Sequence, residues 1–254
     1  MMPSFKLNLP PNWQHVHLNE TDSTMLQLRK PIYANAEKEF VLLTTDYQTA
    51  GRGQRGSSWE ATLGKNLLFG FLFHPAQVSA SRQFLLSEAL ALAVRAALVG
   101  WVENVTVKWP NDVYWGEHKL CGMLLEHDLC GTQIATTLTG VGVNVNQLNF
   151  ESDAPNPISI RQITGKEVCR TELLESILLH FERRYRQLQQ GNDAVIHKEY
   201  MQHLFCAEGW HTYADEGGSF RAKIDSISPM GVLRLKREDG GFRDYAFKQV
   251  KWVK

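Results

Sequence analysis

The stretch DVYWGEHKLCGMLLEHDLCGTQIATTLTGVGVNVN, residues 112–146, decides the fold of this chain. Glycines at 116 and 131 divide it into three pieces that are rich in apolar and β-branched residues, as strands are. Pieces joined by such short breaks pair with their neighbours in sequence. We therefore predict three consecutive strands that form a meander.

The segments around this meander supply more strands and the helices that cover them. Apolar and β-branched runs predict strands at 39–50, 67–73 and 102–109. Apolar residues spaced by three and four predict helices at 81–101 and 171–191 that pack on a sheet. We expect an α+β fold in which a mixed sheet is backed by helices.

Two segments near the N-terminal side carry local signals. Residues 21–30, TDSTMLQLRK, predict a short helix, because Thr24 followed by Gln27 fits a capping box. Residues 51–66, GRGQRGSSWEATLGKN, follow neither the helical nor the strand period and predict a loop.

The composition changes after about residue 205. From there the chain consists of short β-like pieces separated by Gly-Gly at 217–218 and 240–241. About fifty residues of this kind predict a small β-barrel. We expect two domains, residues 1–205 and residues 206–254.

Composition narrows the class of protein and its partners. Lys and Arg number 27, as do Asp and Glu, so the balance of charge calls for neither nucleic acid nor an anionic membrane. The four cysteines form no C-x-x-C pair, which favours free thiols. Neither a signal peptide nor an apolar run of about 18 residues is present. We expect a cytoplasmic protein.

The GRGQRG segment at 51–56 matches G-x-G-x-x-G, but the helix that a dinucleotide-binding turn requires does not follow it. A flexible loop with two arginines could instead close over an anion, because guanidinium groups bind phosphate oxygens through paired hydrogen bonds. A solvated basic loop is the alternative.

KWPND at 108–112 gathers a cation, an aromatic ring, an amide and a carboxylate at the end of a strand. Trp109 itself is expected to serve core packing. Lys119 follows after a short turn, close enough to return toward KWPND. Gly140 and Gly142 allow a ligand or a backbone to approach closely, and Asn144 is a polar residue among valines.

The order of these segments is more specific than any one of them. GRG-x-RG-x-x-W, KWPND, K-x-x-G-x-L-x-E from Lys119 and G-x-G-x-N-x-N from Gly140 follow one another, and this succession resembles the biotin protein ligase family. The resemblance is strong over residues 13–146, weaker over 150–205 and faint in the β-rich tail. It implies a class II synthetase-like sheet, the biotin/lipoyl ligase fold, with an SH3-like β-barrel at the C-terminus.

The resemblance also implies a site. Arg52, Lys119 and Asp112 are its candidate catalytic residues. The residues that match the family's biotin site are Ser23, Thr24, Gln48, Gly51, Arg52, Gly53, Gln54, Lys119, Gly122 and Gly140. The residues that match its ATP and adenylate site are Arg52, Arg55, Trp59, Lys108, Asn111, Asp112, Lys119 and Asn144. Trp59 would pack against adenine, or else be an ordinary buried tryptophan.

The implied activity is ATP-dependent attachment of biotin, through biotinyl-5'-AMP, to a lysine of a biotin carboxyl carrier protein. Fixed cations would offset the charge that gathers at the α-phosphorus. Mg²⁺ is expected to arrive with ATP, and no dedicated metal ligands are expected. A lipoate ligase or acyltransferase and a non-catalytic binding module are the alternatives.

The chain departs from the family's pattern in its loop. The family often has arginine at Gln54 and a basic residue at Ser57, so the loop here carries less charge. Some relatives begin with a DNA-binding domain, whereas only about a dozen residues precede the ligase-like region here, so we expect no nucleic-acid partner. A monomer and a homodimer both remain open.

Overall fold

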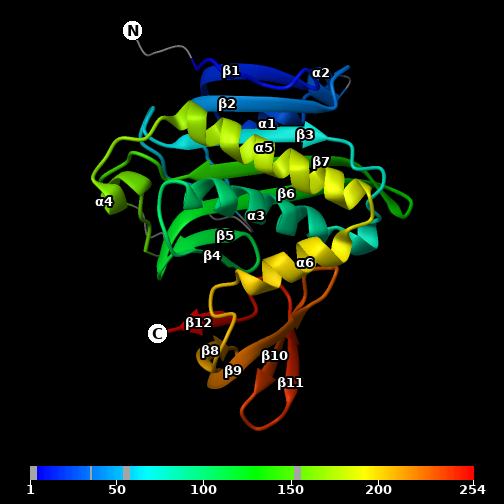
Figure 1. Ribbon diagram of the computed structural model, residues 1–254, viewed down its shortest axis with the longest axis vertical. Helices are drawn as coiled ribbons and strands as arrows, with labels where there is room; N and C mark the ends of the chain where they lie inside the picture. The colour runs from blue at the N-terminus through cyan, green and yellow to red at the C-terminus, as the bar shows by residue number, and fades with distance from the viewer. Residues whose placement is uncertain (1–4, 35, 54–57, 152–155) are drawn as a thin grey trace.

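The computed structural model describes residues 5–34, 36–53, 58–151 and 156–254 (Figure 1). Its larger sheet has seven strands in the order β1-β2-β3-β7-β6-β5-β4. The strands are β1 (Trp13–Thr21), β2 (Phe40–Gln48), β3 (Leu67–Phe73), β4 (Val105–Lys108), β5 (Asp112–Trp115), β6 (His118–Cys130) and β7 (Gln133–Val143). The predicted meander is therefore confirmed as β5, β6 and β7.

The sheet is mixed because β1 runs parallel to β2, whereas every other neighbouring pair is antiparallel. The parallel strands are joined by α1 (Thr24–Leu28) and α2 (Pro31–Ala34). The sequence did not indicate β1, whose side chains are mostly half-buried or exposed at the edge of the sheet.

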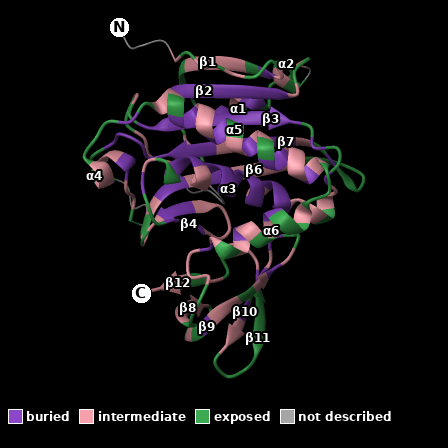
Figure 2. Ribbon diagram, in the orientation of Figure 1, coloured by how far each residue is buried: buried purple, intermediate pink, exposed green. Residues whose placement is uncertain are grey.

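Both faces of the sheet are covered, which explains the continuous apolar runs of β2 and β3. Phe40 and Leu42 face the large core that lies under α3 (Phe84–Val99) and α5 (Arg170–Gln189). Val41 and Leu43 face a smaller apolar cluster beneath α1. Figure 2 shows the central strands buried along their length. The predicted mixed sheet backed by helices is confirmed.

A second, five-stranded antiparallel sheet follows in the order β11-β10-β9-β8-β12. Its strands are β8 (His211–Asp215), β9 (Gly218–Ile227), β10 (Leu233–Arg237), β11 (Phe242–Tyr245) and β12 (Lys251–Val253). Its apolar residues, such as Ile227 and Leu235, belong to the same buried cluster as the core of the larger sheet. Closure into a barrel and the domain boundary at residue 206 stay predictions.

The remaining elements are a 3₁₀ turn at Ala80–Arg82, α4 (Ile160–Thr164) and α6 (Asp193–Gln202). In Figure 1, α6 lies between the two sheets. All four cysteines are free thiols. Across the ranges that the structure describes, helices fall short of the length and apolar character that crossing a membrane requires.

The predicted capping box at Thr24 is wrong. Helix α1 begins at Thr24 with Ser23 as its N-cap, and the Ser23 side chain makes no capping bond. The Asp22 carboxylate accepts from the backbone N–H of Ser23 and from Gln27 Nε2 instead. The Thr24 N–H and hydroxyl both donate to Gln48 Oε1, at 2.8 and 3.2 Å. Thr24 therefore contacts a side chain of β2 rather than capping its own helix.

Candidate active site

A cavity of about 790 Å³ lies on the sheet face that carries α1, opposite α3 and α5. Gly142 of β7 is directly opposite Gly122 of β6, which in turn is directly opposite Asp112 of β5. Residues paired in this way point to the same side of a sheet. At these paired positions β7 and β6 present no side chain to the cavity, and β5 presents a carboxylate.

The indole of Trp59 fills the space above these glycines. A Cβ atom added at Gly142 would lie 2.3 Å from Trp59 Cε2, and one added at Gly122 would lie 2.8 Å from Trp59 Cζ3. Such distances are shorter than van der Waals contact allows. Glycine at both positions is what lets the ring lie against the sheet.

The glycine-arginine loop enters and leaves the cavity at neighbouring points. The Trp59 N–H donates to Gly51 O at 3.0 Å, and Arg52 forms an isolated bridge with Ser58. A Cβ atom at Gly51 would lie 2.7 Å from Trp59 O. The two ends of the loop are thus joined, and Arg52 lines the cavity from there.

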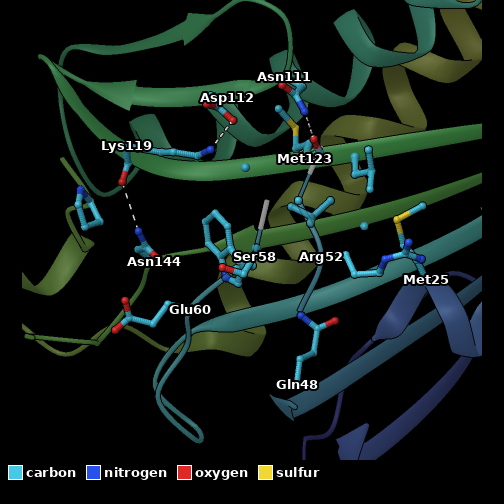
Figure 3. Close-up of a pocket in the computed structure, with 18 of the residues that line it drawn as sticks. Met25, Gln48, Arg52, Ser58, Glu60, Asn111, Asp112, Lys119, Met123 and Asn144 are labelled. Carbon is cyan, nitrogen blue, oxygen red and sulfur yellow. Dashed lines mark hydrogen bonds and ion pairs between the residues drawn. The ribbon is translucent and has the colours of Figure 1, made fainter. Parts of the chain in front are cut away.

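One end of the cavity is formed by α1 and the end of β2. Gln48 and Met25 lie there in Figure 3, together with Thr24, which is hydrogen-bonded to Gln48. The Met25 side chain occupies the space over Gly140, where an added Cβ atom would lie 2.8 Å from its Sδ. This end combines hydroxyl and amide groups with an apolar thioether.

The other end is charged. Lys119 Nζ lies 2.7 Å from Asp112 Oδ1, and both side chains are about one-fifth exposed. Burial raises the pKa of the Asp112 carboxyl, and the Lys119 ammonium opposes this rise. Asn144 donates to Lys119 O at 3.2 Å, and Asn111 Nδ2 donates to Met123 O (Figure 3). The lysine and the carboxylate are thus held in place by the strands beside them.

Two buried polar atoms at the cavity have no partner among the described residues. They are Trp59 Nε1, a donor, and Asn144 Oδ1, an acceptor. Buried polar groups nearly always have a hydrogen-bond partner. Both residues line the cavity, so these two atoms are candidates for contact with a polar ligand bound there.

Most of the predicted site residues meet at this cavity. Those that line it are Ser23, Thr24, Gln48, Arg52, Gly53, Trp59, Asn111, Asp112, Lys119, Gly122, Gly140 and Asn144. Gly51 packs closely against the backbone of Trp59 at the base of the loop. Gln54 and Arg55 lie outside the described residues. Lys108 is not among the described residues that line the cavity; its ammonium lies 4.5 Å from the centre of the Tyr114 ring.

Several lining residues were not expected from the sequence. They are Met25, Ser58, Glu60, Pro110, Met123, Leu124, Val141, Phe150, Glu151, Pro157, Lys248 and Val250, whereas Gly142 lines the cavity as its lack of a side chain suggested. Trp109 also lines the cavity, although it packs as predicted: its indole N–H donates to Gly231 O at 2.9 Å, and its ring lies 5.4 Å from Phe247. The position of Met25 after Ser23 and Thr24 could have pointed to it. Nothing local in the sequence pointed to Lys248.

A cavity with an arginine at its rim and a lysine beside its floor suits a protein that handles an acid together with a nucleotide. The chain belongs to the Biotin/lipoate A/B protein ligase family, whose profile matches residues 19–144. It is 31% identical over 191 residues to a biotin–[acetyl-CoA-carboxylase] ligase from Paracoccus denitrificans, covering 72% of this chain and 78% of that one.

Other relatives extend the match over more of the chain. The bifunctional ligase/repressor BirA of Bacillus spizizenii is 26% identical over 245 residues, which cover 89% of this chain and 71% of that protein. The biotin protein ligase from Aquifex aeolicus in complex with biotin and ATP is similar in structure, with a TM-score of 0.76 and 25% identity. That match covers 94% of this chain and 98% of the other.

Proposed function

We propose that this chain is a biotin protein ligase that forms biotinyl-5'-AMP from biotin and ATP and transfers biotin to a lysine of a carrier protein. The observation that carries the proposal is the meeting of Arg52 and Lys119, which are 67 positions apart in sequence, at one cavity with a glycine floor. The relatives are ligases of this kind, and one related structure holds biotin and ATP.

In the first step a biotin carboxylate oxygen bonds to the α-phosphorus of ATP, and pyrophosphate leaves. Negative charge gathers at the phosphorus, so cations fixed beforehand lower the barrier. Lys119 is fixed by Asp112 at 2.7 Å, and Arg52 extends from a loop whose ends are joined. The indole N–H of Trp59 and the side-chain carbonyl of Asn144, which lack hydrogen-bond partners among the described residues, are the groups that we expect to bind the nucleotide.

Mg²⁺ would enter with the ATP phosphates, because magnesium keeps most of its waters and binds proteins through one or two carboxylates. Among the described residues that line the cavity, Glu60 and Glu151 are the carboxylates other than Asp112, which is paired with Lys119. Over the described ranges, no group of three or more His, Cys, Asp or Glu side chains is arranged to hold a metal by itself. This donor set fits a metal held mainly by the substrate.

In the second step the carrier's lysine nitrogen bonds to the acyl carbon, and AMP leaves with the bonding electrons. The nitrogen must lose a proton on the way. We assign Asp112 to accept it, because this carboxylate lies on the cavity floor and its pKa is raised by burial, toward the range in which a general base is effective.

Biotin is favoured over lipoate because the α1 end of the cavity offers Thr24 and Gln48 hydrogen-bonding groups to a polar ring system. Lipoate has no such polar head. The carrier would be the biotin carboxyl carrier domain of a carboxylase, and the chain would act as a monomer or a homodimer.

The test is to incubate the chain with ATP, Mg²⁺, a biotin carrier domain and either biotin or lipoate, and to weigh the carrier. We expect a biotinyl mass increase that requires both ATP and the carrier's target lysine. A carrier in which that lysine is replaced by arginine is the control. A lipoyl increase without a biotinyl one would assign the chain to the lipoate branch.

A further inference from the structure

Lys108 lies at the end of the row of residues that forms the cavity floor. Across the sheet, Gly142, Gly122 and Asp112 are paired in succession, and Lys108 of β4 is directly opposite Asp112. Its side chain therefore points to the same side of the sheet as the Asp112 carboxylate. It lies one strand beyond the described lining of the cavity.

Three aromatic rings surround the Lys108 ammonium. It lies 4.5 Å from the centre of the Tyr114 ring, 5.4 Å from that of Phe205 and 5.7 Å from that of Trp252. All three are within the distance at which a ring attracts a cation. The Lys108 ammonium also donates to the Tyr114 hydroxyl at 3.4 Å.

These rings come from separate parts of the chain, and each is fixed in place. The Phe205 N–H donates to Val107 O at 2.7 Å, which holds the segment after α6 against β4. Trp252 lies on β12, paired with Tyr213 of β8 in the C-terminal sheet. The rings of Phe205 and Trp252 are 5.2 Å apart. The C-terminal sheet thus reaches the ammonium group of Lys108, at the end of the row.

We propose that Lys108 is a positioning residue: its caged ammonium supports the negative charge of Asp112 during biotin transfer, and Trp252 is the means by which the C-terminal sheet takes part in that step. This inference rests on the role assigned above to Asp112. It differs from the direct phosphate contact that the family resemblance implies for Lys108.

The electrostatics agree with this geometry. Burial lowers the pKa of the Lys108 ammonium, and the charge of Asp112 opposes that change. Burial raises the pKa of the Asp112 carboxyl, which Lys119 and, to a smaller extent, Lys108 oppose. The other titratable groups around the pair are Tyr114, Cys121, Tyr200 and Cys206. Removing the Lys108 charge should therefore raise the pKa of Asp112.

The experiment follows the Asp112 carboxyl directly. Its titration is read by ¹³C NMR of the full chain labelled at aspartate, with the signal assigned from Asp112→Asn. In Lys108→Met we expect the titration to move up by about one pH unit, the effect of losing a nearby opposite charge. Trp252→Leu should move it in the same direction by less, because water then screens the pair. Trp252→Phe, which keeps a ring, should restore it.

The matched control is Trp210→Leu, which removes an exposed ring lying 5.3 Å from the Lys223 ammonium. It should leave the Asp112 signal unchanged. The same variants are then compared in biotin transfer from preformed adenylate, as ratios to the wild-type rate, so that ionisation of the attacking amine cancels. The acid limb of the pH–rate profile for biotin transfer should shift by the same amount as the NMR titration of Asp112.

Each result decides the matter. If the Asp112 carboxyl titrates in Lys108→Met as it does in the wild type, the proposal is overturned. It is also overturned if that titration shifts while the pH–rate profile of biotin transfer does not. If KM for ATP rises tenfold or more while neither the Asp112 titration nor the pH–rate profile of transfer shifts, Lys108 is a phosphate ligand instead. A moved titration in a chain that transfers no biotin would support the coupling of Lys108 to Asp112 and refute the proposed function.

Discussion

At the scale of single residues, the floor of the cavity depends on positions that have no side chain. Gly142 and Gly122 are the places where Trp59 contacts the sheet, and neither position has a left-handed backbone. Glycine is required there for space and not for backbone conformation. A substitution should therefore act on the ring above and leave the strands intact.

Gly142→Ala should displace the Trp59 indole, because the new Cβ would lie 2.3 Å from Trp59 Cε2. Overpacking of this kind costs about 1–3 kcal/mol. We expect most of this free-energy cost to appear as weaker binding of ATP. KM for ATP and tryptophan fluorescence measure the effect. Gly100→Ala, whose Cβ would be 3.3 Å from Ala97 O at the end of α3, is the control. An unchanged KM would contradict the assigned nucleotide position.

Asp112→Asn should slow biotin transfer about a hundredfold, the usual range for losing a general base, while adenylate formation falls less. The amide keeps the size of the carboxylate but cannot accept the amine's proton. Rapid mixing of preformed adenylate with the carrier isolates the second step. Equal losses in both steps would mean that Asp112 serves chiefly to place Lys119.

Cavity residues could be predicted from the sequence where they belong to a short motif. Arg52, Asn111 and Lys119 belong to such motifs and do line the cavity, and so does Gln48, which was placed there by the family resemblance. Lys248 comes from the loop between β11 and β12, and only tertiary folding brings it to the site. Lys108 was placed near the phosphates by resemblance, but the pull of three rings is a tertiary effect that no motif encodes.

At the scale of elements, we expect the loop that begins at Gly51 to control access to the cavity, because Arg52, Gly53 and Ser58 line it. Its described ends are joined by the bond from Trp59 N–H to Gly51 O and by the Arg52–Ser58 bridge. A loop so fixed at its base brings Arg52 to the rim of the cavity. The adenylate is a reactive anhydride, so closure over it would keep water out.

Arg52→Ala should release free biotinyl adenylate or fail to make it. The guanidinium is the described loop group that can bind the adenylate phosphate with paired hydrogen bonds. Adenylate retained after gel filtration is the measurement, and we expect about a tenfold loss, the effect of one charged hydrogen bond. Arg161→Ala, in the short helix α4, is the control. Wild-type retention by Arg52→Ala would refute the role of the loop.

Elements with long apolar runs or a clear helical period were the ones predicted. Strands β2 and β3 are buried on both faces and helix α3 is largely buried, so their apolar patterns are long. Strand β1 was missed because an edge strand has few buried positions. The capping box at Thr24 was wrong because a tertiary partner, Gln48, competes for its hydroxyl.

At the scale of the whole molecule, the two sheets share one apolar core, and Trp109 joins them near the cavity. The family predicted from the order of motifs is confirmed by the family profile and by relatives. The order of motifs was informative because each motif comes from a different strand or loop of one sheet. The closeness of the C-terminal sheet to the site had no such signal.

His15, on the edge strand β1, should make the folded chain sensitive to acid. Its Nε2 lies 2.8 Å from the Thr44 hydroxyl, and burial together with His17 lowers the pKa of its ring to about 4. A lowered folded pKa contributes stability above the unfolded value of about 6.5, and this stability is lost as pH falls toward 4.

Because the ring is only half-buried, we expect a loss of about 1 kcal/mol between pH 7 and pH 5. Urea unfolding at both values measures it. In His15→Gln the free energy of unfolding should fall less over the same interval. His118→Gln, at an exposed histidine, should behave as wild type. Identical pH dependence in all three chains would contradict the assignment.

The central claim, that distant segments form one cavity where biotin is adenylated, is tested most directly by exchange of labelled pyrophosphate into ATP. We predict exchange that requires biotin in the wild-type chain, is lost in the folded Lys119→Met variant, and persists in Lys166→Met, at an exposed lysine. Exchange that proceeds equally without biotin, or that survives Lys119→Met unchanged, would contradict the account.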